Sequence, residues 1–346
     1  MCIALLSTAH PAYQLILINN RDEFLHRPTS RANWWPTPHG HVLGAQDLAR
    51  PLHATWLGIT RQGRLAVLTN FHETSCEQAV GKISRGAIVH GWLTLPADHA
   101  MTVPEFVGDL VLSTGMGASA SRLQDIGGFN LICGQLGSGG KKDKDGSAGN
   151  KTQLAILSNR EDAQDQTAVA DIRGRTIGVS NTGLHDRSWE KVILGERLME
   201  EAIAAQDDDD DDDDDNEQSK EDRLIRRLLA VLSTDTLPRL EGNDADNGVE
   251  AYLPHLPSSI FIPRIGQDLA EEEGQARTDT PLSGMEMPGD RPRRAYLHGV
   301  YATQKQTVIL VGFDGRVRYF ERTLYDDEAK RIPEGEGDCS YEFMID

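Results

Sequence analysis

Two features near the N-terminus have residue types suited to covalent chemistry. Cys2 directly follows Met1, and the polar run Asn20-Arg21-Asp22-Glu23 comes about twenty residues later. A small second residue is compatible with removal of Met1, which would leave a cysteine with a thiol and a free α-amine. The α-amine has a reference pKa of about 8, so part of it is unprotonated at neutral pH and can accept the thiol proton. The pattern predicts a nucleophile and a base on one residue.

Two short apolar runs must position this cysteine. Residues 3–7 and 13–18 are apolar, and Pro11 interrupts the segment between them, which is typical of two buried strands joined by a tight turn. Such a hairpin brings the end of the second strand back beside Cys2. A guanidinium there would stabilise a thiolate or an oxyanion, and a carboxylate would hold the ammonium. Arg21 and Asp22 have these chemistries.

Seven motifs then occur in a characteristic order along the chain. They are Met1-Cys2-Ile3, Asn20-Arg21-Asp22-Glu23-Phe24, Arg27-Pro28-Thr29, Thr55-Trp56-Leu57-Gly58-Ile59, Leu68-Thr69-Asn70-Phe71, Ser84-Arg85-Gly86 and Val179-Ser180-Asn181-Thr182. In this order they resemble the NRDE family, also called transport and Golgi organisation protein 2. The resemblance covers the whole chain apart from its polar insertions.

That family is in turn similar to the N-terminal nucleophile hydrolases, and the resemblance implies a set of site residues. Those enzymes use an N-terminal cysteine, an arginine and an aspartate on the next strand, and two asparagines that orient the amine and form the oxyanion hole. The matching positions are Cys2, Arg21, Asp22, Asn70 and Asn181. These are the candidate catalytic residues.

The sequence also departs from the hydrolase pattern. Arg21 and Asp22 are adjacent, so on a regular strand their side chains point to opposite faces, and Glu23 could replace Asp22 as the companion of Arg21. The family tends to have an arginine where this chain has Gln304, a position that matches a late arginine of the hydrolases. Lys305 could supply that charge instead.

Composition indicates one globular, intracellular domain. The 346 residues with 38% hydrophobic content can bury one large core, so we expect a single NRDE-family domain over 1–346. The four cysteines lack the paired spacing of a disulfide framework or metal knuckle, which favours a reducing compartment. The N-terminal apolar run is broken by Ser7 and His10, so it predicts neither a secretory signal nor a transmembrane segment.

Charge is concentrated in one insertion. The formal net charge is −19, and nine of these charges belong to the aspartate run 207–215, which leaves about −10 for the rest. Direct binding to nucleic acid is therefore disfavoured. Nine like charges repel one another, and their low hydrophobicity predicts a disordered insertion. Disordered insertions are expected at about 137–151, 206–221, 241–248 and 266–291.

Strands outnumber helices in the remaining sequence. Further strands are expected at 54–60, 64–71, 129–134, 153–158, 176–181, 258–262, 307–313 and 316–323, and helices at 77–93, 104–112, 188–205 and 222–232. The pattern alone predicts an α+β or α/β protein. The family resemblance implies a four-layer αββα sandwich of the N-terminal nucleophile hydrolase type.

Two functions of different classes follow from the resemblance and the site. The first is a role in Golgi organisation, protein secretion and intracellular haem or lipid homeostasis, with a polar pocket around Cys2 that takes a small-molecule, lipid or haem ligand. The second is an amidase-type hydrolase acting on amide or thioester bonds. No cofactor is required by either, haem being a cargo to which no residue is assigned. We expect a cytoplasmic protein with peripheral association at the Golgi or mitochondria.

Each candidate residue also has a structural interpretation. Cys2 could be a small buried strand residue, Arg21 and Asp22 an ion pair at a strand end, and Asn70 and Asn181 turn caps. Taken together, however, these residues favour a shared polar site. The 11 histidines are scattered, and the close pair at 39 and 41 lies in a loop rich in proline and glycine without further ligands at metal spacing.

Overall fold

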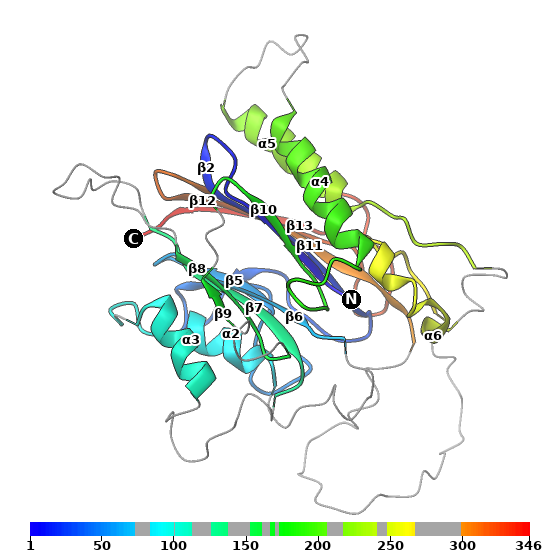
Figure 1. The fold of residues 1–346 in the computed structure, drawn as a ribbon, viewed down its shortest axis with the longest axis horizontal. Helices are drawn as coiled ribbons and strands as arrows, with labels where there is room; N and C mark the ends of the chain where they lie inside the picture. Colours follow the sequence, from blue (N-terminus) through cyan, green and yellow to red (C-terminus); the bar gives the residue numbers. More distant parts are fainter. Residues whose placement is uncertain are drawn as a thin grey trace, which may run out of the picture.

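Two antiparallel β-sheets pack face to face, and helices cover their outer faces (Figure 1). This computed structural model describes residues 1–72, 84–99, 101–112, 126–137, 153–160, 167–169, 173–205, 217–240, 248–266 and 299–346. The arrangement confirms the expected α+β class and the four-layer αββα sandwich.

The first sheet carries the N-terminus. Its six strands run in the order β10-β1-β2-β11-β12-β13. The strands are β1 (Ile3–Ser7), β2 (Tyr13–Phe24), β10 (Thr176–Val179), β11 (Tyr301–Gly312), β12 (Arg316–Thr323) and β13 (Asp338–Met344). The long strands β2 and β11 pair at its centre, so residues from the two ends of the chain lie side by side.

The second sheet is formed by the middle of the sequence, in the order β3-β4-β5-β6-β7-β8-β9. The strands are β3 (Asn33–Trp34), β4 (Val42–Gly44), β5 (Leu57–Thr60), β6 (Arg64–Asn70), β7 (Phe129–Gln135), β8 (Gln153–Ser158) and β9 (Thr167–Val169). Each strand pairs antiparallel with the next in sequence, and the connection from β6 to β7 carries the helices that cover the outer face of this sheet.

Three apolar clusters separate the four layers. One lies between the sheets, a second lies under α4 (Glu190–Ala204) and α5 (Glu217–Leu232) on the first sheet, and a third lies under α2 (Gly86–Leu93) and α3 (Val103–Leu112) on the second. The short helix α6 (Val249–Tyr252) and a 3₁₀ turn at Leu256–Ser258 belong to a fourth cluster, against which Met1 packs.

Strand β2 shows why the sequence has a continuous apolar run followed by polar residues. Leu15 and Leu17 face the second sheet, whereas Ile16 and Ile18 lie under the helices, so both faces of the strand are buried. The polar residues that follow, from 19 to 22, stay in the strand and are at most 5% exposed. Buried polar groups need hydrogen-bond partners, so this end of β2 must be built into a polar site.

Two sequence expectations about strands need correction. The strand expected at 258–262 is wrong: the segment passes from the 3₁₀ turn into an irregular stretch. Pro257 and Pro263 flank it, and proline cannot donate to a strand ladder. Strands β3, β4, β9 and β13 were not expected from the sequence. Of these, β13 is an edge strand in which exposed residues such as Glu342 alternate with core residues such as Phe343.

The expected insertions lie mostly outside the described residues. Helix α5 begins at Glu217, so it includes the last five positions of the range 206–221. The helix expected at 77–93 is described from Gly86 onward. Within the described part of the chain, every helix is too short or too polar to span a bilayer.

Candidate functional site

The β1–β2 hairpin places the N-terminus beside the polar end of β2, as the sequence predicts. Ile3 pairs with Asn20, so the residues just before β1 lie next to those that follow Asn20. Asn20 itself is structural: its Nδ2 donates to the carbonyls of Leu232 and Ile260, 2.7 and 2.9 Å away. It thereby ties the end of α5 to the sheet beside the site.

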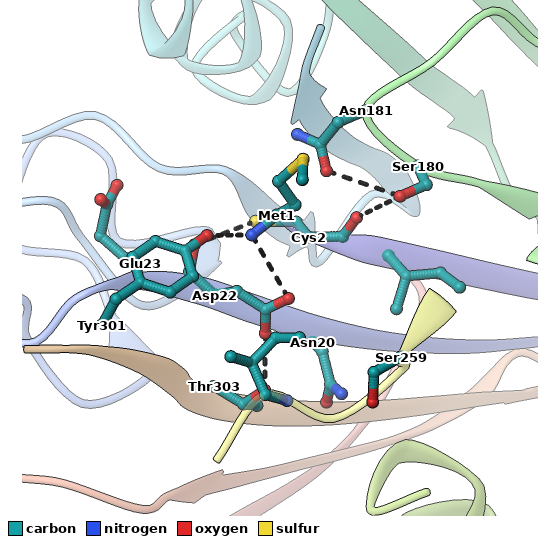
Figure 2. Close-up of polar contacts among 12 residues, drawn as sticks. Met1, Cys2, Asn20, Asp22, Glu23, Ser180, Asn181, Ser259, Tyr301 and Thr303 are labelled. Carbon is teal, nitrogen blue, oxygen red and sulfur yellow. Dashed lines mark hydrogen bonds and ion pairs between the residues drawn. The ribbon is translucent and has the colours of Figure 1, made fainter. Parts of the chain in front are cut away.

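The α-ammonium of Met1 is enclosed by two partners (Figure 2). It donates to the hydroxyl of Tyr301 and forms an ion pair with Asp22, 3.5 Å from Oδ2. The side chain of Met1 is only 10% exposed. Burial lowers the pKa of this amine, and the nearby Lys191 lowers it further, whereas Asp22 acts in the opposite direction. A larger share of the amine is therefore neutral than in an exposed N-terminus.

The thiol of Cys2 has the opposite response to burial. Its Sγ donates to the carbonyl of Asp22 at 3.7 Å. Burial raises the thiol pKa, and the Asp22 carboxylate raises it too, against the lowering effects of the α-ammonium and Arg21. With Met1 in place, the neutral thiol is favoured at neutral pH.

Asp22 is the centre of this site. Its Oδ1 accepts a hydrogen bond from Thr303 at 2.7 Å, and its main-chain carbonyl accepts one from Tyr301 at 3.2 Å. Thr303 in turn accepts a hydrogen bond from the amide of Ile262 at 2.8 Å. Both hydroxyl residues come from β11, which pairs directly with β2, so the strand pairing fixes the carboxylate.

Lys191 closes the site from the first turn of α4. Its side chain is fully buried, and its Nζ donates to the carbonyl oxygen of Met1 at 2.6 Å. The ammonium also lies 5.5 Å from the centre of the Trp189 ring, within cation–π range. Burial lowers the pKa of this lysine, whereas the charges of Asp22 and Cys2 raise it.

Arg21 points into a different environment from Asp22, as expected for adjacent strand residues. Its Nη1 donates to Gln304, its Nη2 lies 3.8 Å from the carboxylate of Glu23, and its guanidinium stacks 4.6 Å from the centre of the Trp56 ring. Glu23 is thus the same-face companion of Arg21. The charge of Arg21 reaches the Cys2 thiol as a weak effect on its pKa.

The two candidate asparagines are joined to each other, and a serine links them to Cys2. Asn181 Nδ2 donates to the carbonyl of Asn70 at 2.5 Å. Figure 2 shows Ser180 Oγ, which donates to the carbonyl of Cys2 at 2.7 Å. Asn181 is 4% exposed, whereas Asn70 is exposed. Asn70 also pairs with Phe129, whose ring lies in the cluster under α2 and α3, and cross-strand partners share a face. The structure therefore brings the side chain of Asn181 to the site. Asn70 reaches the site only through its main-chain carbonyl, which accepts the hydrogen bond from Asn181.

Gln304 and Lys305 occupy distinct places on β11. The register with β2 shifts between Thr303 and Lys305, so Gln304 is the extra residue of an irregularity, where it meets Arg21. Lys305 is buried and binds Glu321 at 3.3 Å and Thr323 at 2.9 Å. Its charge is thus directed to β12 and not to Cys2.

Four residues of the site were not recognised from the sequence: Lys191, Ser180, Tyr301 and Thr303. Tyr301 and Thr303 belong to the segment 301–304, in which only the glutamine at 304, in place of an arginine, was noted from the sequence. Lys191 carried a clearer signal, because it shares the buried face of its helix with Val192, Gly195 and Met199. A lysine on an apolar helical face is a candidate for a buried functional group.

The described residues contain no group of three or more metal-ligating side chains that could hold an ion. The rings of His39 and His41 lie 6.4 Å apart, and His90 from α2 lies 5.5 Å from His39. These histidines lie on the outer side of the second sheet, near α2. The structure assigns no residue to haem.

The fold and the site together define an αββα sandwich whose first two residues are enclosed in a buried polar site. Residues 1–326 match the model of the family described as Transport and Golgi organisation 2, and the chain belongs to this family. It is similar to the Transport and Golgi organization protein 2 homologs of Bos taurus, at 28% identity over 92% of this chain and 90% of the relative, and of Homo sapiens, at 27% over 92% and 89%. Among solved structures, it is similar to the Caenorhabditis elegans N-acylethanolamine-hydrolyzing acid amidase ortholog. That similarity covers 69% of this chain and 88% of the other, with a TM-score of 0.36 and 13% identity.

Proposed function

We propose that the protein acts in Golgi organisation and protein secretion, and that it handles a small ligand, haem or a lipid, in the pocket around Cys2. Family membership and the names of the relatives support the cellular role. The proposal places the protein in the cytoplasm, peripherally at the Golgi or mitochondria.

One observation supports a binding site around Cys2: three ionisable groups are buried together there. They are the Met1 ammonium, the Asp22 carboxylate and the Lys191 ammonium. Removing charges from water costs several kcal/mol per ion, and apolar residues would fill the same volume at lower cost. Clustered ionisable groups, some with shifted pKa values like those of the Met1 amine and Lys191, are typical of functional sites. The charges therefore support a binding role beyond that of holding the fold together.

A rescue experiment tests this role. Cells that lack their own family member would receive the wild-type chain, Asp22→Asn or Lys191→Met, and secretion of a reporter and Golgi morphology would be measured. We expect both site variants to lose rescue at equal protein abundance. Arg197→Met is the matched control, because Arg197 lies on the exposed face of the same helix as Lys191. Full rescue by both site variants would contradict a functional pocket.

A second candidate function is an N-terminal cysteine hydrolase acting on amide or thioester bonds. The proximity of a thiol, an α-amine and a carboxylate favours it. In this reaction the Cys2 thiolate attacks a carbonyl carbon, the amine carries the proton to the leaving group, and Asn181 stabilises the oxyanion, because the Asn70 side chain lies on the other face of β6. The raised thiol pKa with Met1 in place means that only the form lacking Met1 would be competent.

Substitution of Cys2 separates the two candidates. A hydrolase should lose turnover in Cys2→Ala and be strongly slowed in Cys2→Ser. A ligand carrier should retain secretion rescue in both variants, because a small side chain suffices at this position. Loss of rescue in a folded Cys2→Ala protein would favour the hydrolase.

A further inference from the structure

Lys191 has an unusual partner for a fully buried ammonium. Among the described residues, the Lys191 ammonium donates to the neutral main-chain carbonyl of Met1. No carboxylate of these residues lies close enough to the ammonium to form an ion pair with it. Asp22 contributes only at longer range, since it is paired with the N-terminus and hydrogen-bonded to Thr303. The lysine is therefore held by the main chain of Met1 and not by a charged partner.

Met1 is bound through its ammonium, its carbonyl and its side chain, as a ligand would be, and Figure 2 shows the contacts of the ammonium. Its ammonium contacts Tyr301 and Asp22, and its carbonyl contacts Lys191. Its thioether chain packs against the apolar cluster formed by Leu237, Val249, Tyr252, Leu256, Ile262, Ile265 and Tyr301. Loss of Met1 would leave an apolar space with polar groups at one end, next to the Cys2 thiol.

The charges indicate which chemistry fits that space. Without Met1, the α-ammonium belongs to Cys2 and Asp22 still balances a single positive charge. Among the described residues, Lys191 then has a buried charge and no hydrogen-bond acceptor, and an unpaired buried charge is strongly unfavourable. A ligand oxygen that is negative or strongly polarised would replace the lost carbonyl, whereas a cationic ligand would be repelled.

We propose that Met1 acts as an internal ligand, and that after its removal Lys191 binds the carboxylate or carbonyl oxygen of a small molecule whose apolar group fills the space of the methionine side chain. The inference rests on the proposed function of the pocket and adds to it the binding residue and the ligand chemistry. Met1 thereby keeps the site closed until it is removed.

Calorimetric titration of two purified full-length forms tests the proposal, one retaining Met1 and one beginning at Cys2. The probe is sodium hexanoate, with hexanamide to represent a neutral carbonyl and hexylamine as the cationic counterpart. We expect hexanoate or hexanamide to bind the form that begins at Cys2 at least ten times more tightly than the form with Met1. Hexylamine should bind neither form. The stronger of the first two probes identifies the preferred oxygen.

Lys191→Met in the form beginning at Cys2 should weaken binding of the preferred probe at least tenfold, because it keeps the side-chain length and removes the donor. Arg197→Met should leave binding unchanged, and thermal unfolding of both variants verifies that they are folded. Equal binding to the two parent forms, absence of binding to the form beginning at Cys2, or undiminished binding by Lys191→Met would each overturn the proposal. Secretion rescue is measured separately, so failure here leaves the proposed cellular role to its own test.

Discussion

The carboxylate of Asp22 and the α-ammonium of Met1 form a buried ion pair across adjacent strands, with 3.5 Å between Oδ2 and the nitrogen. This pair joins the first residue of the chain to the centre of the first sheet. It makes the charge state of the N-terminus part of the stability of the fold.

Replacing Asp22 by asparagine should therefore destabilise the protein that retains Met1. Asn can still accept the Thr303 hydrogen bond, but the ammonium loses its charge partner, and breaking a buried pair costs roughly 3 kcal/mol. Because burial lowers the pKa of the amine in the folded state, the unfolded chain holds this proton to higher pH. The loss should be larger at pH 6, where more of the amine carries a charge, than at pH 9, where the amine is mostly neutral in both states.

Urea unfolding at the two pH values measures this loss. Glu201→Gln is the control, because its pair with Arg197 is exposed and should change the free energy of unfolding by less than about 1 kcal/mol. An equal loss for Asp22→Asn at both pH values would contradict the role of the ammonium.

The Cys2 thiol of the protein that retains Met1 should be alkylated slowly. Its pKa lies above the usual value because of burial, so its thiolate fraction at pH 7.5 is below that of an exposed thiol. Iodoacetamide treatment followed by quantitative mass spectrometry should give a Cys2 alkylation rate below that of glutathione. The Cys2 rate should continue to rise as the pH increases beyond 9. A Cys2 rate above that of glutathione at pH 7.5 would show an activated thiolate in spite of Met1.

Gln304 should stabilise the fold through Arg21. It is 1% exposed and accepts a hydrogen bond from the guanidinium, and such bonds to a charged group contribute roughly 2 kcal/mol. Gln304→Ala should lower the free energy of unfolding by about that amount. Gln218→Ala, which removes an exposed glutamine contact at the start of α5, should have little effect. Equal stability of the two variants would mean that Glu23 and Trp56 alone hold Arg21.

The aspartate run 207–215 should be dispensable for folding. It lies outside the described residues and remains a predicted disordered insertion, now limited at its far end by the start of α5 at Glu217. Replacing the nine aspartates by glycine and serine keeps the loop length and removes like-charge repulsion, so stability should be unchanged or slightly higher. A fall in melting temperature of more than a few degrees would indicate that the aspartates bind the folded part of the chain.

The sequence predicted the parts of the site that depend on local pattern. The apolar runs of β1 and β2 specify a hairpin, and the hairpin alone places Arg21 and Asp22 near Cys2. The alternation of strand side chains also showed that Arg21 and Asp22 point to opposite faces, and it left Glu23 as a possible companion of Arg21. These relations involve residues close in sequence or on one strand.

The missed residues depend on distant pairings. Tyr301 and Thr303 reach Asp22 only because β11 pairs with β2, and no local signal specifies that two strands nearly 300 residues apart are neighbours. Lys191 reaches Met1 through the packing of α4 on the first sheet. Asn70 shows the converse limit, since its motif was recognised but its position at a strand end left the direction of its side chain open.

The central position of β2 between β1 and β11 has a consequence for biosynthesis. The partners that enclose Met1 are Asp22, Lys191 and Tyr301, and the last of these is translated some 300 residues after the N-terminus. At about 5–20 residues per second, the first residue stays accessible to ribosome-associated processing enzymes for roughly 15–60 s before its enclosure can form. The topology of the first sheet therefore delays the closure of the site until β11 has been synthesised.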